Sequence, residues 1–387
     1  MKTSNSQSVK TENIKLVIEK LIELRETSRI ELARLTTLNK ATISSIISEL
    51  VIKEIVIETD KTVKTSGRSA KVIALNKNAG RILSIELLTD SLYGVITNLF
   101  GTILYEVRKE ISDPEFRPYL TILLSTIDEL KENTIDSKYG VIGIGIGVYG
   151  ILSKSKKIKY APFTSWKDIE LKTIIEDYTG IKTYVENEAN ISALGEHLVY
   201  AEQDNLISLN IGIGVGMGII IDNKLYTGEN GYAGEIGHTI IVPNGKKCVC
   251  GNYGCLEKYI SNSALVERYA ELSKETISLS EIINRYKHQD KHAITVYNEF
   301  IDLLSLTINN ISQILNPKTI VINSKVVESI PESISAVKNK LRSQIMSLEV
   351  LTTSKYRSKT NVLGLTHVLI QNFLNVENYK IKDTTKN

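Results

Sequence analysis

The chain has 387 residues, of which 42% are hydrophobic, and a formal net charge of +3. This length and composition predict two or three domains with substantial cores. No stretch has the length and apolarity of a membrane span or an export signal, so we expect a cytoplasmic protein. Residues 1–80 carry 14 Lys and Arg against 9 Asp and Glu, whereas the rest of the chain carries 33 against 35. This N-terminal surplus favours a nucleic-acid-binding head on a neutral body, although a merely solvated surface would show it too.

The first 50 residues predict three helices. Apolar residues recur at helical spacing from Asn13 to Arg25. Ser28, with Glu31 three residues later, is placed to cap a second helix. After a short turn, Asn39 is placed to cap a third helix from Lys40 to Leu50, whose apolar positions fall on one face. The order of the last two helices is that of a helix-turn-helix.

The outward face of the third predicted helix carries short hydrogen-bonding side chains and a lysine near its N-terminal end. Such side chains reach phosphates and base edges when a helix enters the major groove, and the helix dipole favours phosphate at this end. We therefore interpret it as a recognition helix. The residues of the head predicted to bind DNA are Arg29, Asn39, Lys40, Thr42, Ser44, Ser45, Lys64 and Arg68.

Two strand-like runs follow, Ile55–Thr59 and Lys71–Leu75. The stretch that joins them, Asp60–Ala70, is polar, basic and contains glycine. This pattern predicts a hairpin with a loop at its tip, the wing of a winged helix-turn-helix. Lys64 and Arg68 would contact phosphates or the minor groove from this loop. The alternative is a helical interaction module whose outer face is only solvated.

From Arg81 onward, strand-like runs alternate with helical patterns, which favours an α/β architecture with buried strands. The predicted strands are Ile82–Glu86, Leu92–Asn98, Ile103–Arg108, Val141–Val148, Ile181–Val185, Leu206–Ile211 and Thr319–Ile322. The predicted helices are Tyr119–Glu132, Leu171–Tyr178, Ala189–Tyr200, Ser263–Lys274 and Ala293–Leu315.

Two segments, Gly143–Gly150 and Gly212–Gly218, are rich in glycine, which we interpret as loops. Glycines at strand ends let the backbone approach a ligand, but tight packing of a strand against a helix requires them too. Neither segment matches the Gly-x-x-x-x-Gly-Lys-Ser/Thr phosphate loop, so nucleotide binding does not follow from them.

All the cysteines of the chain lie in one short segment that follows His238 closely. Three thiolates and one imidazole form the ligand set of a closed tetrahedral zinc site, and glycine turns at Asn244-Gly245 and Gly251–Gly254 allow so short a segment to fold around one ion. The alternatives are free cysteines that cluster by chance, or an oxidised pair. The predicted ligands of a structural Zn²⁺ are His238, Cys248, Cys250 and Cys255.

Four motifs occur in an order and spacing that resemble the ROK family of repressors, open reading frames and sugar kinases. They are Glu186–Asn190, Asn210–Ile220, Gly234–His238 and Cys248–Glu257. With the winged head, the resemblance extends over nearly the whole chain. Within the family, the head and the segments Leu38–Thr42 and Asn244–Cys248 look most like the xylose-responsive repressors.

The resemblance implies an α/β body of two actin-like (ribonuclease H-like) lobes with a sugar cleft between them, in a homodimer or tetramer. It divides the chain into a winged helix-turn-helix over residues 1–80, a first lobe over 81–185 and a second lobe over 186–363. A C-terminal helix near 364–376 would complete the first lobe.

The resemblance also implies two partners, operator DNA and a sugar effector, D-xylose. The residues that would touch the sugar are Asn187, Glu188, Glu235, His238 and Glu257. His238 would serve twice, with one ring nitrogen on the metal and the other directed toward the sugar, because a metal-bound imidazole must donate its second N–H to some acceptor.

The chain departs from the family's sugar kinases at the positions that serve phosphoryl transfer. Glu188 stands where the kinases have a catalytic aspartate, and the phosphate loop Asp-x-Gly-Gly-Thr is here Glu86–Asp90 without its glycines. Gly-Thr-Gly has become Gly212–Gly214 with Ile213 in the middle, and Asn323-Ser324 replaces a Gly-Gly pair. We therefore expect a repressor without catalytic residues. A kinase with a regulatory head is the alternative, and a repressor that answers to another ligand, or to none, is a third.

Overall fold

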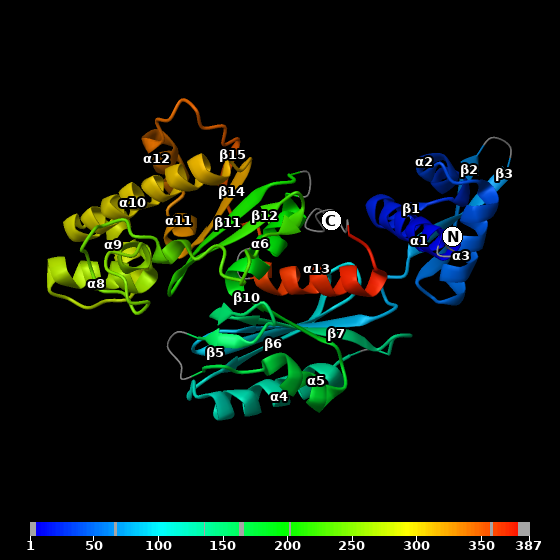
Figure 1. Cartoon of the computed structure of the whole chain (residues 1–387), viewed down its shortest axis with the longest axis horizontal. Helices are drawn as coiled ribbons and strands as arrows, with labels where there is room; N and C mark the ends of the chain where they lie inside the picture. Colours follow the sequence, from blue (N-terminus) through cyan, green and yellow to red (C-terminus); the bar gives the residue numbers. More distant parts are fainter. Residues whose placement is uncertain are drawn as a thin grey trace. The chain divides into compact units, whose positions relative to one another are not determined.

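The computed structural model describes residues 5–65, 68–134, 136–161, 166–200, 203–356 and 359–377. The chain divides into two compact units (Figure 1). The first contains Met1–Ile151, Lys156–Glu186 and Val362–Asn387, and the second contains Leu152–Ser155 and Asn187–Asn361. Among the described residues, no helix is both long and apolar enough to cross a membrane.

The N-terminal part of the first unit contains three helices followed by a hairpin. Its elements are α1 (Asn5–Leu24), β1 (Glu26–Thr27), α2 (Arg29–Thr36), α3 (Lys40–Ile52), β2 (Val56–Thr65) and β3 (Arg68–Leu75), with the strands in the order β1-β3-β2. Both predicted caps are confirmed: Ser28 Oγ accepts from the Glu31 N–H at 3.3 Å, and Asn39 Oδ1 accepts from the Thr42 N–H at 2.8 Å. Leu32, Ile43 and Ile47 form the buried side of the helix-turn-helix.

The hairpin differs from its prediction. β2 and β3 continue through most of the stretch predicted to be a loop, with Thr62 paired to Lys71 and Thr65 to Arg68. Thr62, Val63 and Thr65 are residue types that favour strands, and the loop interpretation gave them too little weight against the glycine and the charges of this stretch. β1 was not predicted, because two residues show no periodicity; it pairs with β3 at Ile73 and Ala74.

The rest of the first unit is a five-stranded sheet with helices. Its elements are β4 (Arg81–Leu87), β5 (Ser91–Thr97), β6 (Ile103–Glu110), α4 (Phe116–Glu132), β7 (Val141–Val148), β8 (Ile151–Leu152), β9 (Ile158–Tyr160), α5 (Leu171–Thr179), β10 (Thr183–Asn187) and α13 (Thr360–Leu374). The strand order is β10-β7-β4-β5-β6, and β8 pairs separately with β9. α4 and α5 cover one face of the sheet and α13 the other (Figure 1).

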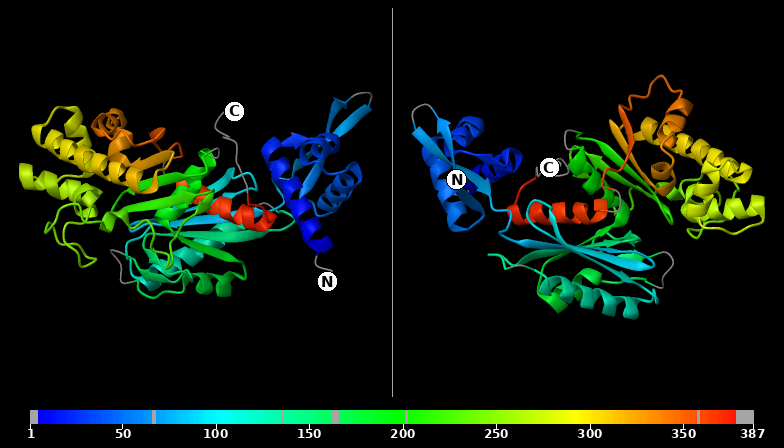
Figure 2. Two further views of the ribbon diagram at one scale, coloured as in Figure 1. Left: turned by 45° about the horizontal axis from the view of Figure 1, so that its top comes forward. Right: turned by 180° about the vertical axis from the view of Figure 1, so that it is seen from behind.

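The second unit also contains a five-stranded sheet. Its elements are α6 (Glu188–Val199), β11 (Leu206–Ile211), β12 (Val215–Ile221), β13 (Lys224–Leu225), η1 (Ile236–His238), α7 (Glu257–Ile260), α8 (Asn262–Ser273), α9 (Leu279–Lys287), α10 (Lys291–Leu315), β14 (Thr319–Ser324), α11 (Lys325–Ser329), α12 (Ser333–Lys340) and β15 (Val350–Thr353). The strand order is β13-β12-β11-β14-β15. The main core packs α8, α9 and α10 on one face of this sheet, and α6 lies on the other (Figure 2).

The two sheets share one topology. In each, the first three strands form antiparallel pairs, the fourth pairs in parallel with the first, and the spatial order is third, second, first, fourth, fifth. A repeated lobe of this kind is the actin-like, ribonuclease H-like architecture expected from the motifs.

Gly143, Gly145 and Gly147 lie in β7, which agrees with the predicted strand Val141–Val148, and Gly216 and Gly218 lie in β12, whereas Gly212–Gly214 form the bend between β11 and β12. The interpretation of both segments as loops throughout is therefore wrong. A Cβ at Gly143 would lie 2.8 Å from Leu369 of α13, and one at Gly218 would lie 2.2 Å from the backbone oxygen of Ala189 in α6. Glycine is therefore needed where a helix packs closely on a strand. Of the two explanations considered for these glycines, close approach to a ligand and tight packing, the contacts favour packing.

Candidate functional site

A hollow of about 330 Å³ opens on the head between α2, α3 and β3. Arg29, Lys40, Ser44 and Lys71 line it together with Ile30. The exposed side chains of Lys40, Ser44 and Ser45 project from the outer face of α3, as a recognition helix requires. The structure therefore gathers three cations beside the predicted recognition face.

The other residues predicted to bind DNA are placed differently. The Asn39 side-chain oxygen is engaged as the helix cap, and Thr42 is half-buried beside it. Lys64 lies in β2 and Arg68 in β3, but their side chains fall outside what the structure describes. Lys71 was predicted only as a strand residue; Val72 and Ile73 after it are both buried, so no alternation in the sequence marks Lys71 as part of this hollow.

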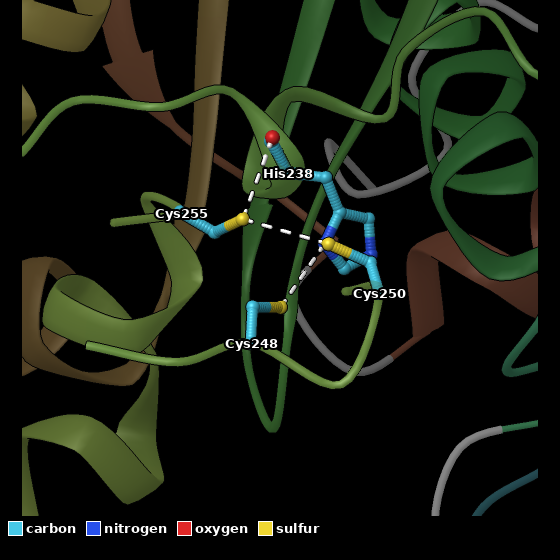
Figure 3. A group of neighbouring side chains, drawn as sticks. All are labelled: His238, Cys248, Cys250 and Cys255. Atoms are coloured by element: carbon cyan, nitrogen blue, oxygen red, sulfur yellow. Dashed lines mark hydrogen bonds between the residues drawn. The ribbon is translucent and has the colours of Figure 1, made fainter. Parts of the chain in front are cut away.

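The predicted zinc ligands converge in the second unit (Figure 3). The donor atoms of His238, Cys248, Cys250 and Cys255 all lie within 4.8 Å of one another. Cys250 Sγ lies 3.6 Å from Cys255 Sγ, and His238 Nδ1 lies 3.6 Å from Cys248 Sγ. Zinc bonds of about 2.0–2.3 Å arranged tetrahedrally place ligand atoms roughly 3.5–3.8 Å apart, so the donor set fits one ion.

Tight turns bring these ligands together. Gly251 and Gly254 adopt φ values of +98° and +82°, and a Cβ at Gly254 would lie 1.7 Å from the Val242 carbonyl oxygen. Cys248 and Cys255 are buried while Cys250 is exposed, and the described cysteines form no disulfide. The turns that glycine alone permits therefore determine where the thiols meet.

Two carboxylates flank the histidine of this cluster. His238 Nε2 lies 3.9 Å from Glu235 Oε2, and His238 Nδ1 lies 3.8 Å from Glu257 Oε1. The Cys248 thiol donates to the same Glu257 oxygen at 3.0 Å. Burial raises the pKa of the Glu235 carboxyl; His238 opposes this effect and Glu257 adds to it. Nδ1 thus faces Cys248 Sγ, and Nε2 faces Glu235.

Asn187 and Glu188 stand at the start of α6. The Asn187 side chain caps this helix by accepting from the N–H groups of Ala189 and Asn190 at 2.8 and 3.3 Å. Glu188 lines a polar cavity of about 270 Å³. The segment from Gly234 to His238 and the helix α6 both pack against β12, which connects the two parts of the predicted sugar set.

The cavity beside Glu188 was not predicted from the sequence. Its other lining residues are Ser192, Asn210, Ile211, Asn262, Asn323, Ser324, Lys325, Glu328, Thr360 and Asn361. Asn323 Nδ2 donates to Ser192 Oγ, Ser208 Oγ and Asn210 Oδ1 at 2.7–2.9 Å. Asn323, which stands where the family kinases have glycine, is thus tied into an internal network. In the first unit, Glu86 and Leu87 end β4, and the bond from Leu88 N to Ser91 O at 2.9 Å closes the short connection to β5.

A winged head joined to two actin-like lobes, one of which carries a three-cysteine, one-histidine cluster, defines the class of protein. The family model described as "ROK family" matches residues 82–372, and the chain belongs to this family. It is 32% identical to the "Xylose repressor" of Bacillus subtilis over 97% of this chain and 99% of that relative.

Two solved structures show the same fold. The "ROK family transcriptional regulator, homolog of E.coli MLC protein" covers 94% of this chain and 98% of its own, with a TM-score of 0.78 and 24% identity. The ROK family glucokinase from Streptomyces griseus, solved with glucose and AMPPNP, covers 75% of this chain and 99% of its own, with a TM-score of 0.65 and 23% identity. The kinase structure therefore leaves a quarter of this chain unmatched, while the regulator structure leaves very little.

Proposed function

We propose that this protein is a transcriptional repressor of xylose-utilisation genes, whose head binds operator DNA and releases it when D-xylose binds the body. The observation that carries this proposal is the head itself, with a capped recognition helix and the cations Arg29, Lys40 and Lys71 beside it. The relative from Bacillus subtilis, named a xylose repressor, is similar over the head as well as the body.

The sugar would be held by the carboxylates around His238. Glu235 and Glu257 offer acceptors to the hydroxyl groups of a sugar, and the second ring nitrogen of His238 lies between the cluster and Glu235. Asn187 and Glu188 would add contacts from the start of α6. Zn²⁺ held by the three thiolates and His238 Nδ1 would fix this loop, and its role would be structural because all four positions are protein ligands.

The regulatory function is better supported than phosphoryl transfer. The relatives similar over nearly the whole chain are named repressors, including the xylose repressors of Bacillus subtilis and Caldicellulosiruptor bescii. Leu88, in the connection after β4, and the hydrogen-bonded Asn323 occupy positions where the sugar kinases of the family have glycines. No residue is therefore assigned a catalytic role.

The repressor would act in the cytoplasm as a homodimer, because two recognition helices related by a two-fold axis read the two halves of a palindrome. Release requires that the sugar bind the DNA-free state more tightly than the DNA-bound state. Binding of D-xylose to the second unit would supply this difference.

The test is fluorescence anisotropy of a labelled duplex from upstream of pentose-utilisation genes, at fixed salt, titrated with D-xylose, D-glucose and ATP. We expect tight binding that D-xylose alone reverses. Glu235→Gln should bind the duplex normally and lose the response, whereas Glu229→Gln, at a side chain 89% exposed, should keep it. Binding that no sugar reverses would reject xylose as the effector. A chain that binds no duplex specifically but phosphorylates a sugar would instead be a kinase.

A further inference from the structure

We infer that Glu58 positions the cations of the head over the recognition helix and thereby sets how strongly the protein prefers its operator to other DNA. The inference rests on the proposed DNA-binding function and concerns the same surface. Glu58 lies on β2, outside the helix-turn-helix, and no sequence pattern marks it as part of the site.

One carboxylate contacts two of the three cations of the hollow. Glu58 Oε1 accepts from Arg29 Nη2 at 2.8 Å, and Glu58 Oε2 accepts from Lys71 Nζ at 3.2 Å. The Glu58 side chain is 28% exposed and that of Arg29 34%, whereas that of Lys71 is 70% exposed. Lys71, and to a smaller extent Arg29, hold the pKa of the Glu58 carboxyl below its usual range, so it is ionised at neutral pH.

The contact with Glu58 directs the Arg29 guanidinium along the outer face of α3. Arg29 Nη1 lies 3.4 Å from Ser44 Oγ and 3.5 Å from Ser48 Oγ, both on exposed residues one turn apart. A guanidinium held at both ends of its fork is oriented before DNA arrives. Less side-chain entropy is then lost when it reaches a guanine edge or a phosphate.

The Glu58 carboxylate also weakens the non-specific electrostatic attraction between the cations of the head and DNA phosphates. Each phosphate neutralised by a free cation strengthens binding to any duplex and steepens its salt dependence. Glu58 partly neutralises Arg29 and Lys71, so a random duplex gains little from them. At the correct sequence, the oriented guanidinium makes contacts that offset the loss of its ion pair. Glu58 therefore separates specific from non-specific affinity.

The test compares the full-length protein with three variants, Glu58→Gln, Glu58→Asp and Glu31→Gln. Glu31→Gln is the matched control, because this substitution changes the charge of the head by the same amount. Glu31 pairs with Arg34 at 2.6 Å on the exposed side of α2. The probes are a duplex that the wild-type protein selects from a random pool and a scrambled duplex of the same composition. The dissociation constant of each is measured at four salt concentrations.

Glu58→Gln is expected to bind the scrambled duplex more tightly, with a salt slope steeper by about one, and to lose about tenfold in its preference for the selected duplex. Glu58→Asp should recover part of that preference, and Glu31→Gln should keep it. Equal effects of Glu58→Gln and Glu31→Gln would show that Glu58 contributes only its charge. This outcome would overturn the inference about Glu58 but leave the proposed DNA-binding function intact. A wild-type protein that selects no duplex would overturn the proposed function as well.

Discussion

At the scale of single residues, the candidate metal site consists of four side chains that a few turns bring together. Val249 lies between two of the predicted ligands, and its side chain is 76% exposed. Val249 lies in the same loop but has no atom that could bind a metal ion. A substitution at Val249 is therefore a control for substitutions of Cys248 and Cys250.

We predict that Cys248→Ser lowers the zinc content of the purified protein from about one ion per chain to a small fraction, because a serine hydroxyl stays protonated and is a poor ligand for zinc. Val249→Ser should retain the metal. Zinc is measured by elemental analysis after dialysis against a weak chelator. Equal metal content in the two variants would exclude Cys248 as a ligand.

His238 shows which features of the site can be predicted from residue types and which cannot. The types Cys, Cys, Cys and His identify a metal set, and the structure confirms that the four donor atoms converge. Which ring nitrogen faces the sulfur atoms is a matter of backbone direction in η1, and the sequence does not encode it in any local pattern. Because η1 packs on β12, with a Cβ at Gly237 lying 2.2 Å from the Val215 oxygen, long-range packing decides the orientation.

At the scale of elements, α6 contains a buried carboxyl that the proposed function does not use. Glu196 is fully buried, and Thr360 Oγ1 donates to its Oε1 at 3.3 Å. Burial raises the pKa of Glu196 to about 7, which bonds from Ser354 and Thr360 oppose. A Cβ at the neighbouring Gly195 would lie 2.2 Å from the Thr360 oxygen, so Gly195 and Thr360, which both belong to the second unit, are in direct contact.

Glu196 should make stability depend on pH. In the unfolded chain the carboxyl loses its proton near pH 4.5, whereas the native state retains it up to about pH 7. The native state binds the additional proton between these values, so the free energy of unfolding should fall as pH rises from 4.5 to 7, by roughly 3 kcal/mol at most.

We predict that Glu196→Gln removes this decrease, because the amide is neutral at every pH. The variant should match the wild type near pH 5 and exceed its denaturation midpoint at pH 8. Urea denaturation followed by circular dichroism at pH 5, 6, 7 and 8 measures the effect. Glu132→Gln, at an exposed position of α4, serves as the control, and parallel pH curves for all three proteins would contradict the assignment.

At the scale of the whole molecule, the proposal combines a DNA-binding head with a body that binds sugar. One helix-turn-helix covers only half of a palindrome, and two linked heads bind far more tightly than one because the second contact is intramolecular. The number of heads on the DNA is therefore part of the function.

We predict that scrambling one half of the selected palindrome weakens binding by about a hundredfold or more, and that the intact operator binds two chains. Anisotropy with both duplexes and sedimentation velocity of the complex give the two quantities. A half-scrambled duplex bound as tightly as the intact one would show that a single head suffices.

The sequence by itself determined the helix-turn-helix with its caps at Ser28 and Asn39, the alternation of strands and helices, and the group of three cysteines and one histidine that could hold a metal ion. Each depends on local periodicity or on residue type within a short segment. Tertiary structure alone decided that Gly216 and Gly218 lie in β12, that Glu58 joins Arg29 and Lys71, and that a polar cavity lies beside Glu188. These depend on contacts between segments distant in the chain, because the closeness of two backbones and the pairing of two charges arise only when the chain folds.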